Sequence, residues 1–217
     1  MSEVVSIDRD GAAAARTALE RHVGDGGIAI FPADGLYGLA CDPLNEAAVD
    51  RIQELKGRDE HKPSAVMYFA PLAMRELFSS MGERARAVAG ELLPGPVTLV
   101  IANPGHRYPL ACRQDPGRLG IRLIEAPLAG ARTPVFQTSA NRSGEPPPSS
   151  FEELCPMLLD AADLAIDGGE LTGEPSTVVD IAELDSGGDW SVIREGAISR
   201  VALERRLAPL LRPADHG

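Results

Sequence analysis

The segment Gly27-Ile28-Ala29-Ile30-Phe31 is a short apolar run closed by Pro32, a pattern that favours a buried strand. The Gly-rich residues 33–38 come next and are predicted to form a loop. Before the strand, residues 11–23 are rich in alanine and predict a helix, with Asp10 as its N-cap and Gly24 just past its end. The first third of the chain thus begins with a helix followed by a buried strand.

A second helix is predicted to begin after Asn45, whose side chain can cap it. It carries an apolar stripe of Val49, Ile52 and Leu55 and stops at Gly57. Lys56 and Arg58 therefore lie at its C-terminal end, where the backbone carbonyls favour cations. We expect both side chains to be partly exposed there.

Strand-like and helix-like segments alternate along the rest of the chain. Further strands are predicted at residues 65–69, 97–101, 119–123, 134–138, 163–167, 176–181 and 190–194. Further helices are predicted at residues 71–80, 83–93, 150–159 and 199–210. This alternation predicts one layered α/β domain over residues 1–217, with its core at about 8–200. Because the connections vary in length, we expect a mixed sheet.

Composition limits the classes of function. The chain has 217 residues and a net charge of −11, which argues against a broad contact with a nucleic-acid backbone. The sequence has no run of apolar residues long enough to span a membrane, so we expect a cytoplasmic protein. Its three cysteines show no metal-ligand spacing and are expected to be reduced. The four histidines are scattered, so no metal site is predicted.

Several familiar catalytic motifs are absent. The chain has no GxxxxGK[ST] motif and no GxGxxG that opens a helix after a strand, so neither a P-loop nor a dinucleotide fold is predicted. HExxH and GxSxG are also missing.

Four polar segments stand out instead, and each also has an ordinary structural explanation. They are Lys56-Gly57-Arg58, Thr138-Ser139-Ala140-Asn141-Arg142-Ser143-Gly144, Pro175-Ser176-Thr177-Val178-Val179-Asp180 and Ile193-Arg194-Glu195-Gly196. They can be, respectively, helix-end caps, a polar turn, the entry to a strand and a surface arginine. As functional segments they suit an anion pocket, because loops beyond strand ends bind ligands in α/β proteins. The chain has only two lysines, Lys56 and Lys62, and both lie beside the first segment.

The order of these segments resembles the YrdC/Sua5 family, the threonylcarbamoyl-AMP synthases. The matching elements span residues 28 to about 200 and are Pro32-Ala33-Asp34-Gly35-Leu36-Tyr37-Gly38-Leu39, Lys56-Gly57-Arg58, Pro94-Gly95-Pro96-Val97-Thr98, Ile121-Arg122-Leu123, the segment from Ser139 to Gly144, the segment from Pro175 to Asp180, and Arg194-Glu195-Gly196. The resemblance implies a three-layer α/β (α+β) fold. In this fold helices flank a strongly twisted mixed sheet around a concave cationic cleft.

The resemblance also implies a reaction. In it, L-threonine, bicarbonate or CO2, and ATP give threonylcarbamoyl-AMP and pyrophosphate. The product would pass to a tRNA threonylcarbamoyl-transferase complex, which modifies adenosine 37 of tRNAs that read codons starting with A. Mg²⁺ would arrive with ATP, held by phosphates and water. Direct tRNA binding is expected to be weak at most, and a homodimer is compatible with the sequence.

Roles for individual residues follow from the same resemblance. Lys56 and Arg58 are assigned to catalysis and to the ATP triphosphate. Ser139, Asn141 and Arg194 are assigned to ATP binding. The threonine side is assigned to Arg122, Ser139, Ser176 and Tyr37, because a guanidinium can bind the threonine carboxylate through two hydrogen bonds.

The first motif departs from the family pattern P-T-[DE]-T-[VL]-Y-G-L, because Ala33 and Gly35 replace both threonines. Asp59 stands where a proline commonly follows, and Met67 stands where some members carry a histidine. ATP use is therefore predicted more strongly than threonine specificity. Two alternatives stay open at this point. One is a paralogue that adenylates another small carboxylate or carbamate, and the other is a non-catalytic RNA-binding module.

Overall fold

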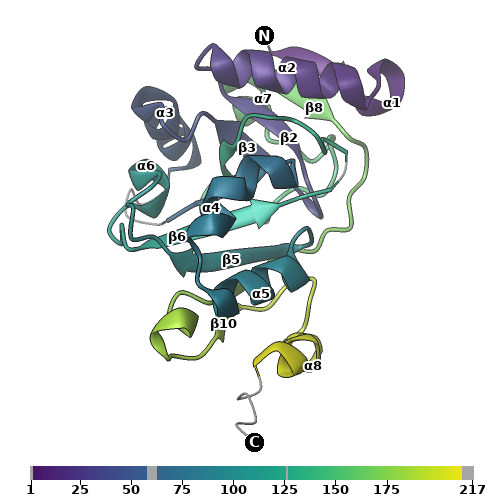
Figure 1. Cartoon of the computed structure of the whole chain (residues 1–217). Helices are drawn as coiled ribbons and strands as arrows, with labels where there is room; N and C mark the ends of the chain where they lie inside the picture. The colour runs from purple at the N-terminus through teal and green to yellow at the C-terminus, as the bar shows by residue number, and fades with distance from the viewer. Residues whose placement is uncertain (1, 58–62, 126, 212–217) are drawn as a thin grey trace, which may run out of the picture.

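The computed structural model describes residues 2–57, 63–125 and 127–211 (Figure 1). Ten strands form one mixed sheet in the order β1-β8-β2-β3-β7-β4-β6-β5-β9-β10. The strands are β1 (Glu3–Ser6), β2 (Ala29–Ala33), β3 (Leu36–Cys41), β4 (Ala65–Tyr68), β5 (Val97–Ala102), β6 (Arg118–Leu123), β7 (Val135–Ser139), β8 (Leu164–Asp167), β9 (Thr177–Asp180) and β10 (Ser191–Arg194). The sheet contains both parallel pairs such as β4–β6 and antiparallel pairs such as β4–β7, which confirms the predicted mixed sheet.

Helices cover both faces of this sheet. They are α1 (Ile7–Asp10), α2 (Ala12–Gly24), α3 (Glu46–Lys56), α4 (Arg75–Ser80), α5 (Glu83–Leu92), α6 (Pro109–Cys112), α7 (Pro156–Ala161) and α8 (Arg200–Leu211), with short 3-10 helices η1 (Pro71–Met74) and η2 (Leu184–Ser186). Figure 1 shows α1 and α2 at one end of the molecule and α5 and α8 at the opposite end. No helix in the described ranges is both long and apolar enough to cross a membrane.

The core has two parts because β2 alternates its side chains between the two faces of the sheet. Ile28 and Ile30 belong to the larger cluster, with α3, α4, α5 and α8. Ala29 and Phe31 belong to the smaller cluster, which α2 covers. Helix, sheet and helix thus make the predicted three layers. Val5 of β1 and Leu207 of α8 are both buried, so these two elements also contribute to the hydrophobic core.

The predicted loop at residues 33–38 is wrong. β2 continues through Pro32 to Ala33, β3 starts at Leu36, and only Asp34 and Gly35 form the turn of a tight hairpin. Gly38 belongs to a strand, where a Cβ would come within 2.9 Å of Gln137 Nε2. The glycines that indicate a loop in the sequence instead serve close packing inside the sheet.

Two helix predictions also need correction. Asp10 does not cap α2, because it ends α1 and accepts a hydrogen bond from the Ser6 backbone N–H, and the N-cap of α2 is Gly11. The helix predicted at 150–159 begins only at Pro156 and ends at Ala161. Cys155 precedes a proline, and a residue in that position disfavours helical geometry. The caps predicted for α3 are confirmed: Asn45 accepts from the Ala48 N–H, and Gly57 ends the helix in the left-handed region.

Thr177, the first residue of β9, holds the turn that follows β10. Its hydroxyl donates to the Ile198 carbonyl at 2.6 Å and accepts from the N–H groups of Gly196 and Ile198 at 3.1 and 2.9 Å. The side chain is fully buried, so water cannot replace these bonds. The turn fixes where β10 ends, and with it the position of Arg194.

We predict that Thr177→Val lowers the free energy of unfolding by roughly 2 kcal/mol, because the variant keeps the shape but leaves buried N–H groups unpaired. Urea denaturation measures this change. Thr17→Val is the matched control, since the exposed Thr17 hydroxyl bonds only to the Ala13 carbonyl within α2. Equal stability of Thr177→Val and the wild type would refute the structural role of the hydroxyl.

Candidate functional site

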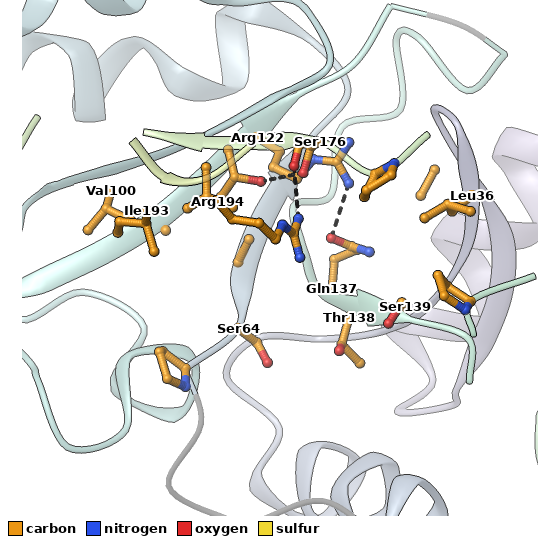
Figure 2. Close-up of a pocket in the computed structure, with 18 of the residues that line it drawn as sticks. Leu36, Ser64, Val100, Arg122, Gln137, Thr138, Ser139, Ser176, Ile193 and Arg194 are labelled. Carbon is orange, nitrogen blue, oxygen red and sulfur yellow. Dashed lines mark hydrogen bonds between the residues drawn. The ribbon is translucent and has the colours of Figure 1, made fainter. Parts of the chain in front are cut away.

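A cleft of about 630 Å³ opens on the sheet, and the ends of several strands line it. Its walls come from the β2–β3 hairpin, the end of α3, the loop after β7, and strands β4, β5, β6, β9 and β10. This volume lies within the range of small-molecule sites. Figure 2 shows Arg122, Gln137, Ser139, Ser176 and Arg194 gathered around the space.

The cleft brings together seven of the eight residues assigned from the sequence. They are Tyr37, Lys56, Arg122, Ser139, Asn141, Ser176 and Arg194, which come from segments far apart in the chain. The eighth, Arg58, lies outside the described residues. Proximity is thus established for these seven, and their individual roles stay predictions.

Lys56 is buried, which corrects the expectation that it is partly exposed. Its Nζ donates to the Asn141 carbonyl at 2.7 Å and to the Ser139 carbonyl. The Lys56 carbonyl accepts from the Ser143 N–H at 2.8 Å. Side chain and backbone of the last residue of α3 therefore both hold the loop after β7. Burial arises because the loop folds over the helix end.

Asn141 organises the same loop from within. Its Nδ2 donates to the carbonyls of Arg142 and Glu145 at 2.8 and 2.7 Å. Its Oδ1 is buried and has no hydrogen-bond partner within the described ranges. The amide oxygen is thus an acceptor that a bound ligand could use. The Ser139 side chain lies at the end of β7 and also lines the cleft.

Arg122 lies on β6 with its side chain 6% exposed. Its Nη2 forms an ion pair with Asp34 at the hairpin tip, and its Nη1 donates to Gln137 Oε1 at 3.4 Å. Its Nε has no partner in the described part of the chain. Burial lowers the pKa of the guanidinium against the opposing effect of Asp34, and burial raises the pKa of the Asp34 carboxyl against the effect of Arg122.

Arg194, at the end of β10, is exposed and donates to the Ser176 carbonyl at 2.8 Å. It makes no ion pair with any residue that the structure describes. The Ser176 Oγ lies 2.9 Å from the Oγ1 of Thr98 on β5, so the two hydroxyls share a hydrogen bond. Arg194 is therefore a cleft cation whose charge a ligand anion can use.

Tyr37 lines the cleft, and its hydroxyl bonds to the loop after β8. The hydroxyl donates to the Gly169 carbonyl at 2.8 Å and accepts from the Gly168 N–H at 2.9 Å. Burial raises the pKa of Tyr37 to about 12. The phenol thus anchors the loop after β8, and its proton is not available to a ligand in this arrangement.

Gly35, where the family pattern has threonine, sits directly under the segment 172–174. A Cβ on Gly35 would clash with the Glu174 carbonyl oxygen and with the Thr172 hydroxyl. The Gly173 N–H donates to the Gly35 carbonyl at 2.9 Å. The segment 172–174 therefore packs directly against Gly35, and Glu174 and Pro175 line the cleft beside it.

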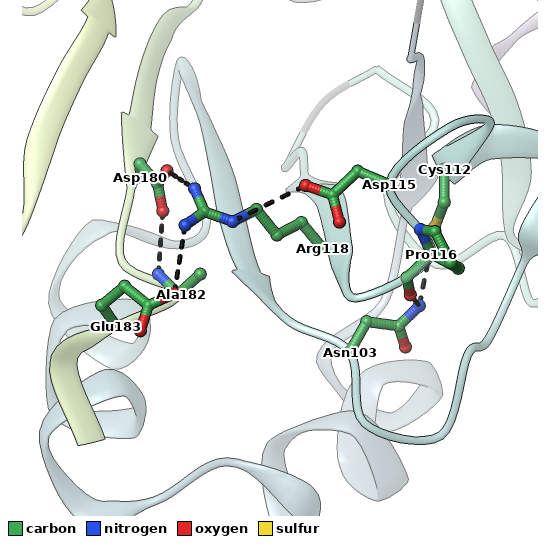
Figure 3. A network of polar contacts seen from close by, with 8 residues as sticks. All are labelled: Asn103, Cys112, Asp115, Pro116, Arg118, Asp180, Ala182 and Glu183. Carbon is green, nitrogen blue, oxygen red and sulfur yellow. Dashed lines mark hydrogen bonds and ion pairs between the residues drawn. The ribbon is translucent and has the colours of Figure 1, made fainter. Parts of the chain in front are cut away.

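Sequence reasoning missed Arg118, which lines the other end of the cleft. Figure 3 shows its guanidinium joined to Asp180 and Asp115, and it also pairs with Glu183 at 3.1 Å. A signal was present, because Arg118, Gly120 and Arg122 alternate along one strand and so share a face. Asp34 was missed as well, since its partner lies 88 residues away in sequence.

Within the described residues, no group of three or more His, Cys, Asp or Glu side chains is arranged to hold a metal ion. The idea that Mg²⁺ arrives with a nucleotide thus stays a prediction.

Residues 21–196 match the family model Sua5_yciO_yrdC, which is described as "Telomere recombination". The relatives that bear the name threonylcarbamoyl-AMP synthase include two of different length. One, from Pyrococcus abyssi, is 29% identical over 205 residues, which make up 89% of this chain and 57% of the relative. The other, from Thiobacillus denitrificans, is 30% identical over 180 residues, or 77% of this chain and 92% of the relative. This chain thus spans little more than half of the Pyrococcus abyssi protein.

Two solved structures are similar over most of the chain. Pyrococcus abyssi Sua5 complexed with L-threonine has a TM-score of 0.79 and 26% identity, and the match covers 95% of this chain and 60% of that one. E. coli YciO has a TM-score of 0.78 and 24% identity, and the match covers 92% of this chain and 98% of that one. The fold predicted from the sequence is confirmed by both.

Lys56→Met should lower the free energy of unfolding by about 2 to 3 kcal/mol, because the loop carbonyls lose charge-assisted hydrogen bonds. Arg194→Met is the matched comparison, because it removes a cation that lines the same cleft but is exposed. It should change the free energy of unfolding by less than about 0.5 kcal/mol. Urea denaturation of both variants tests the contrast. If Lys56→Met were as stable as Arg194→Met, Lys56 would not hold the loop.

Proposed function

The chain belongs to the Sua5/YciO/YrdC family, and on that premise we propose that it is an L-threonylcarbamoyladenylate synthase. The observation that carries the proposal is the cleft, which gathers the seven assigned residues. It also offers a cation, Arg194, that makes no ion pair with any described residue and lines the same cleft as the buried guanidinium of Arg122. Relatives that bear the name of this enzyme support the assignment.

The proposed reaction joins two anions, so its main physical problem is repulsion. The amine of L-threonine combines with CO2 from bicarbonate and loses a proton. A carbamate oxygen then attacks the α-phosphorus of ATP, and pyrophosphate leaves. The carbamate is already a nucleophile, so the protein needs no strong general base for the second step. The protein must place the carbamate oxygen in line with the α-phosphorus and the leaving pyrophosphate, and it must supply positive charge around the reacting groups.

The described residues can divide that work. Arg194 is exposed at the cleft and suits the nucleotide phosphates. The Asn141 Oδ1, which has no partner among the described residues, would accept from an O–H or N–H group of the nucleotide, and the Ser139 hydroxyl would add a further hydrogen bond. Lys56 shapes the loop that presents both, and we propose that its charge also acts on the triphosphate, together with Arg58. Mg²⁺ bound to ATP would offset phosphate charge.

The amino-acid end of the cleft is assigned to Arg122 and Ser176. Arg122 would hold the threonine carboxylate, and Ser176 would lie beside the threonine side chain. Tyr37 would contribute ring contact rather than its hydroxyl, which is bonded to the loop after β8.

The whole protein's partners follow from the same proposal. We propose one catalytic domain over residues 1–217, with ATP, L-threonine and bicarbonate as substrates. The adenylate would be handed to a tRNA threonylcarbamoyl-transferase complex. The net charge of −11 disfavours tight tRNA binding by this chain itself.

Purified protein with ATP, Mg²⁺ and bicarbonate should release pyrophosphate in a threonine-dependent way. A coupled pyrophosphate assay measures the rate, with glycine and serine as amino-acid controls. Release at the same rate without any amino acid would remove the threonine assignment.

Arg194→Gln should lower kcat/KM for ATP roughly 10- to 100-fold, because a charged contact to phosphate is lost. Arg142→Gln is the matched control: the same charge is removed from an exposed residue on the loop after β7. Steady-state kinetics at fixed ionic strength measure both variants, and kcat/KM for ATP of Arg142→Gln should stay within twofold of wild type. Equal losses in both variants would point to a general effect of charge instead of a contact by Arg194.

A second candidate function is favoured by one observation. Because the segment 172–174 occupies the space beside Gly35, the amino-acid end differs from the family pattern. A paralogue that adenylates another small amino acid or carbamate would use the same nucleotide end. The pyrophosphate assay run over a panel of amino acids separates the two, since the paralogue would prefer a different substrate.

A further inference from the structure

The ion pair between Asp34 and Arg122 joins parts of the sheet that are not neighbours. Asp34 is at the tip of the β2–β3 hairpin, and Arg122 is on β6, with β7 and β4 between them in the strand order. The tip thus reaches across the concave face to β6. Asp34 adopts a φ of 68°, in the left-handed region that a non-glycine residue seldom occupies.

The ion pair with Asp34 does not satisfy all the N–H donors of the Arg122 guanidinium. A carboxylate can bind an arginine through two parallel N–H···O bonds. Asp34 instead accepts from Nη2 through a single oxygen, Oδ2, and the Nε–H has no partner in the described ranges. A buried N–H without an acceptor is a costly arrangement. A ligand carboxylate that replaced Asp34 and accepted from both Nη2 and Nε would relieve that cost.

The two partners also differ in how they meet solvent. The Arg122 side chain is 6% exposed, whereas the Asp34 side chain is 21% exposed. If the pair opens, Asp34 can regain water and Arg122 cannot. A ligand carboxylate that takes the place of Asp34 keeps the buried charge neutralised, so the exchange avoids leaving an isolated charge in the interior.

We propose that Asp34 is an internal carboxylate that competes with the carboxylate of the amino-acid substrate for Arg122, and so sets the affinity of the cleft for that substrate. The proposal rests on the proposed function for its choice of ligand. Asp34 acts through Arg122 and is a positioning residue, and Gln137 holds the other side of the guanidinium.

Asp34→Asn removes the competing charge with little change of shape. Isothermal titration at fixed pH and ionic strength, with L-threonine, glycine and acetate as separate probes, should show a dissociation constant about tenfold lower than wild type for the carboxylate that binds. The dissociation constant for ATP should stay within twofold. In steady state, KM for the amino acid should fall more than kcat changes, which a merely structural role would not produce.

Asp115→Asn is the matched control. Asp115 lines the same cleft, and its partner Arg118 keeps Asp180 and Glu183 after the change. It alters the charge of the cleft by the same amount and should leave carboxylate affinity within twofold.

Asp34→Asn leaves a buried guanidinium without a counter-charge and could fail to fold. Gln137→Glu covers that case, because it adds a carboxylate beside Arg122 and keeps the guanidinium paired. It should weaken carboxylate binding about tenfold.

Unchanged or weaker carboxylate binding in folded Asp34→Asn would overturn the proposal, as would unchanged binding in Gln137→Glu. Absence of binding by every form to every carboxylate tested would overturn it too. If a carboxylate other than threonine binds and Asp34→Asn tightens it, the proposal stands and the threonine assignment fails. If wild type turns over threonine while both variants bind it equally well, only the proposal fails.

Discussion

Lys56 carries its ammonium group into the protein interior, where an unpaired charge would cost several kcal/mol. The charge is held by two carbonyls of the loop after β7, those of Ser139 and Asn141. These hydrogen bonds connect the end of α3 to the loop after β7, and together the two segments form one wall of the cleft. A loop that moved away from Lys56 would lose both of these charge-assisted hydrogen bonds, so Ser139 and Asn141 are held beside the cleft.

The cations of the cleft consequently differ in what they can do. Lys56 and Arg122 are buried and already bonded to the protein, whereas Arg194 is exposed at its rim. A buried, bonded cation gives shape and a fixed potential, and an exposed one gives a contact that a phosphate can take up. Gly35 shapes the cleft as well, because the absence of a side chain lets the segment 172–174 pack directly against the β2–β3 turn.

The sequence allowed the fold to be predicted where local signals were strong. Asn45 and Gly57 bound α3 as expected, and the apolar runs of β4, β5, β6 and β7 were found within a residue or two. The hairpin of β2 and β3 was missed because Pro32, Gly35 and Gly38 resemble loop residues. Packing against Glu174 and Gln137 explains the two glycines, and the local sequence does not show it. The pairing of Asp34 with Arg122 depends on strand order, which no local pattern contains.

A crystal structure of the full chain with ATP and L-threonine tests the central claim most directly, that one cleft serves both substrates. We expect the triphosphate beside Arg194 and the loop after β7, with the threonine carboxylate on Arg122. A nucleotide bound outside the cleft, or a threonine carboxylate held away from Arg122, would contradict it.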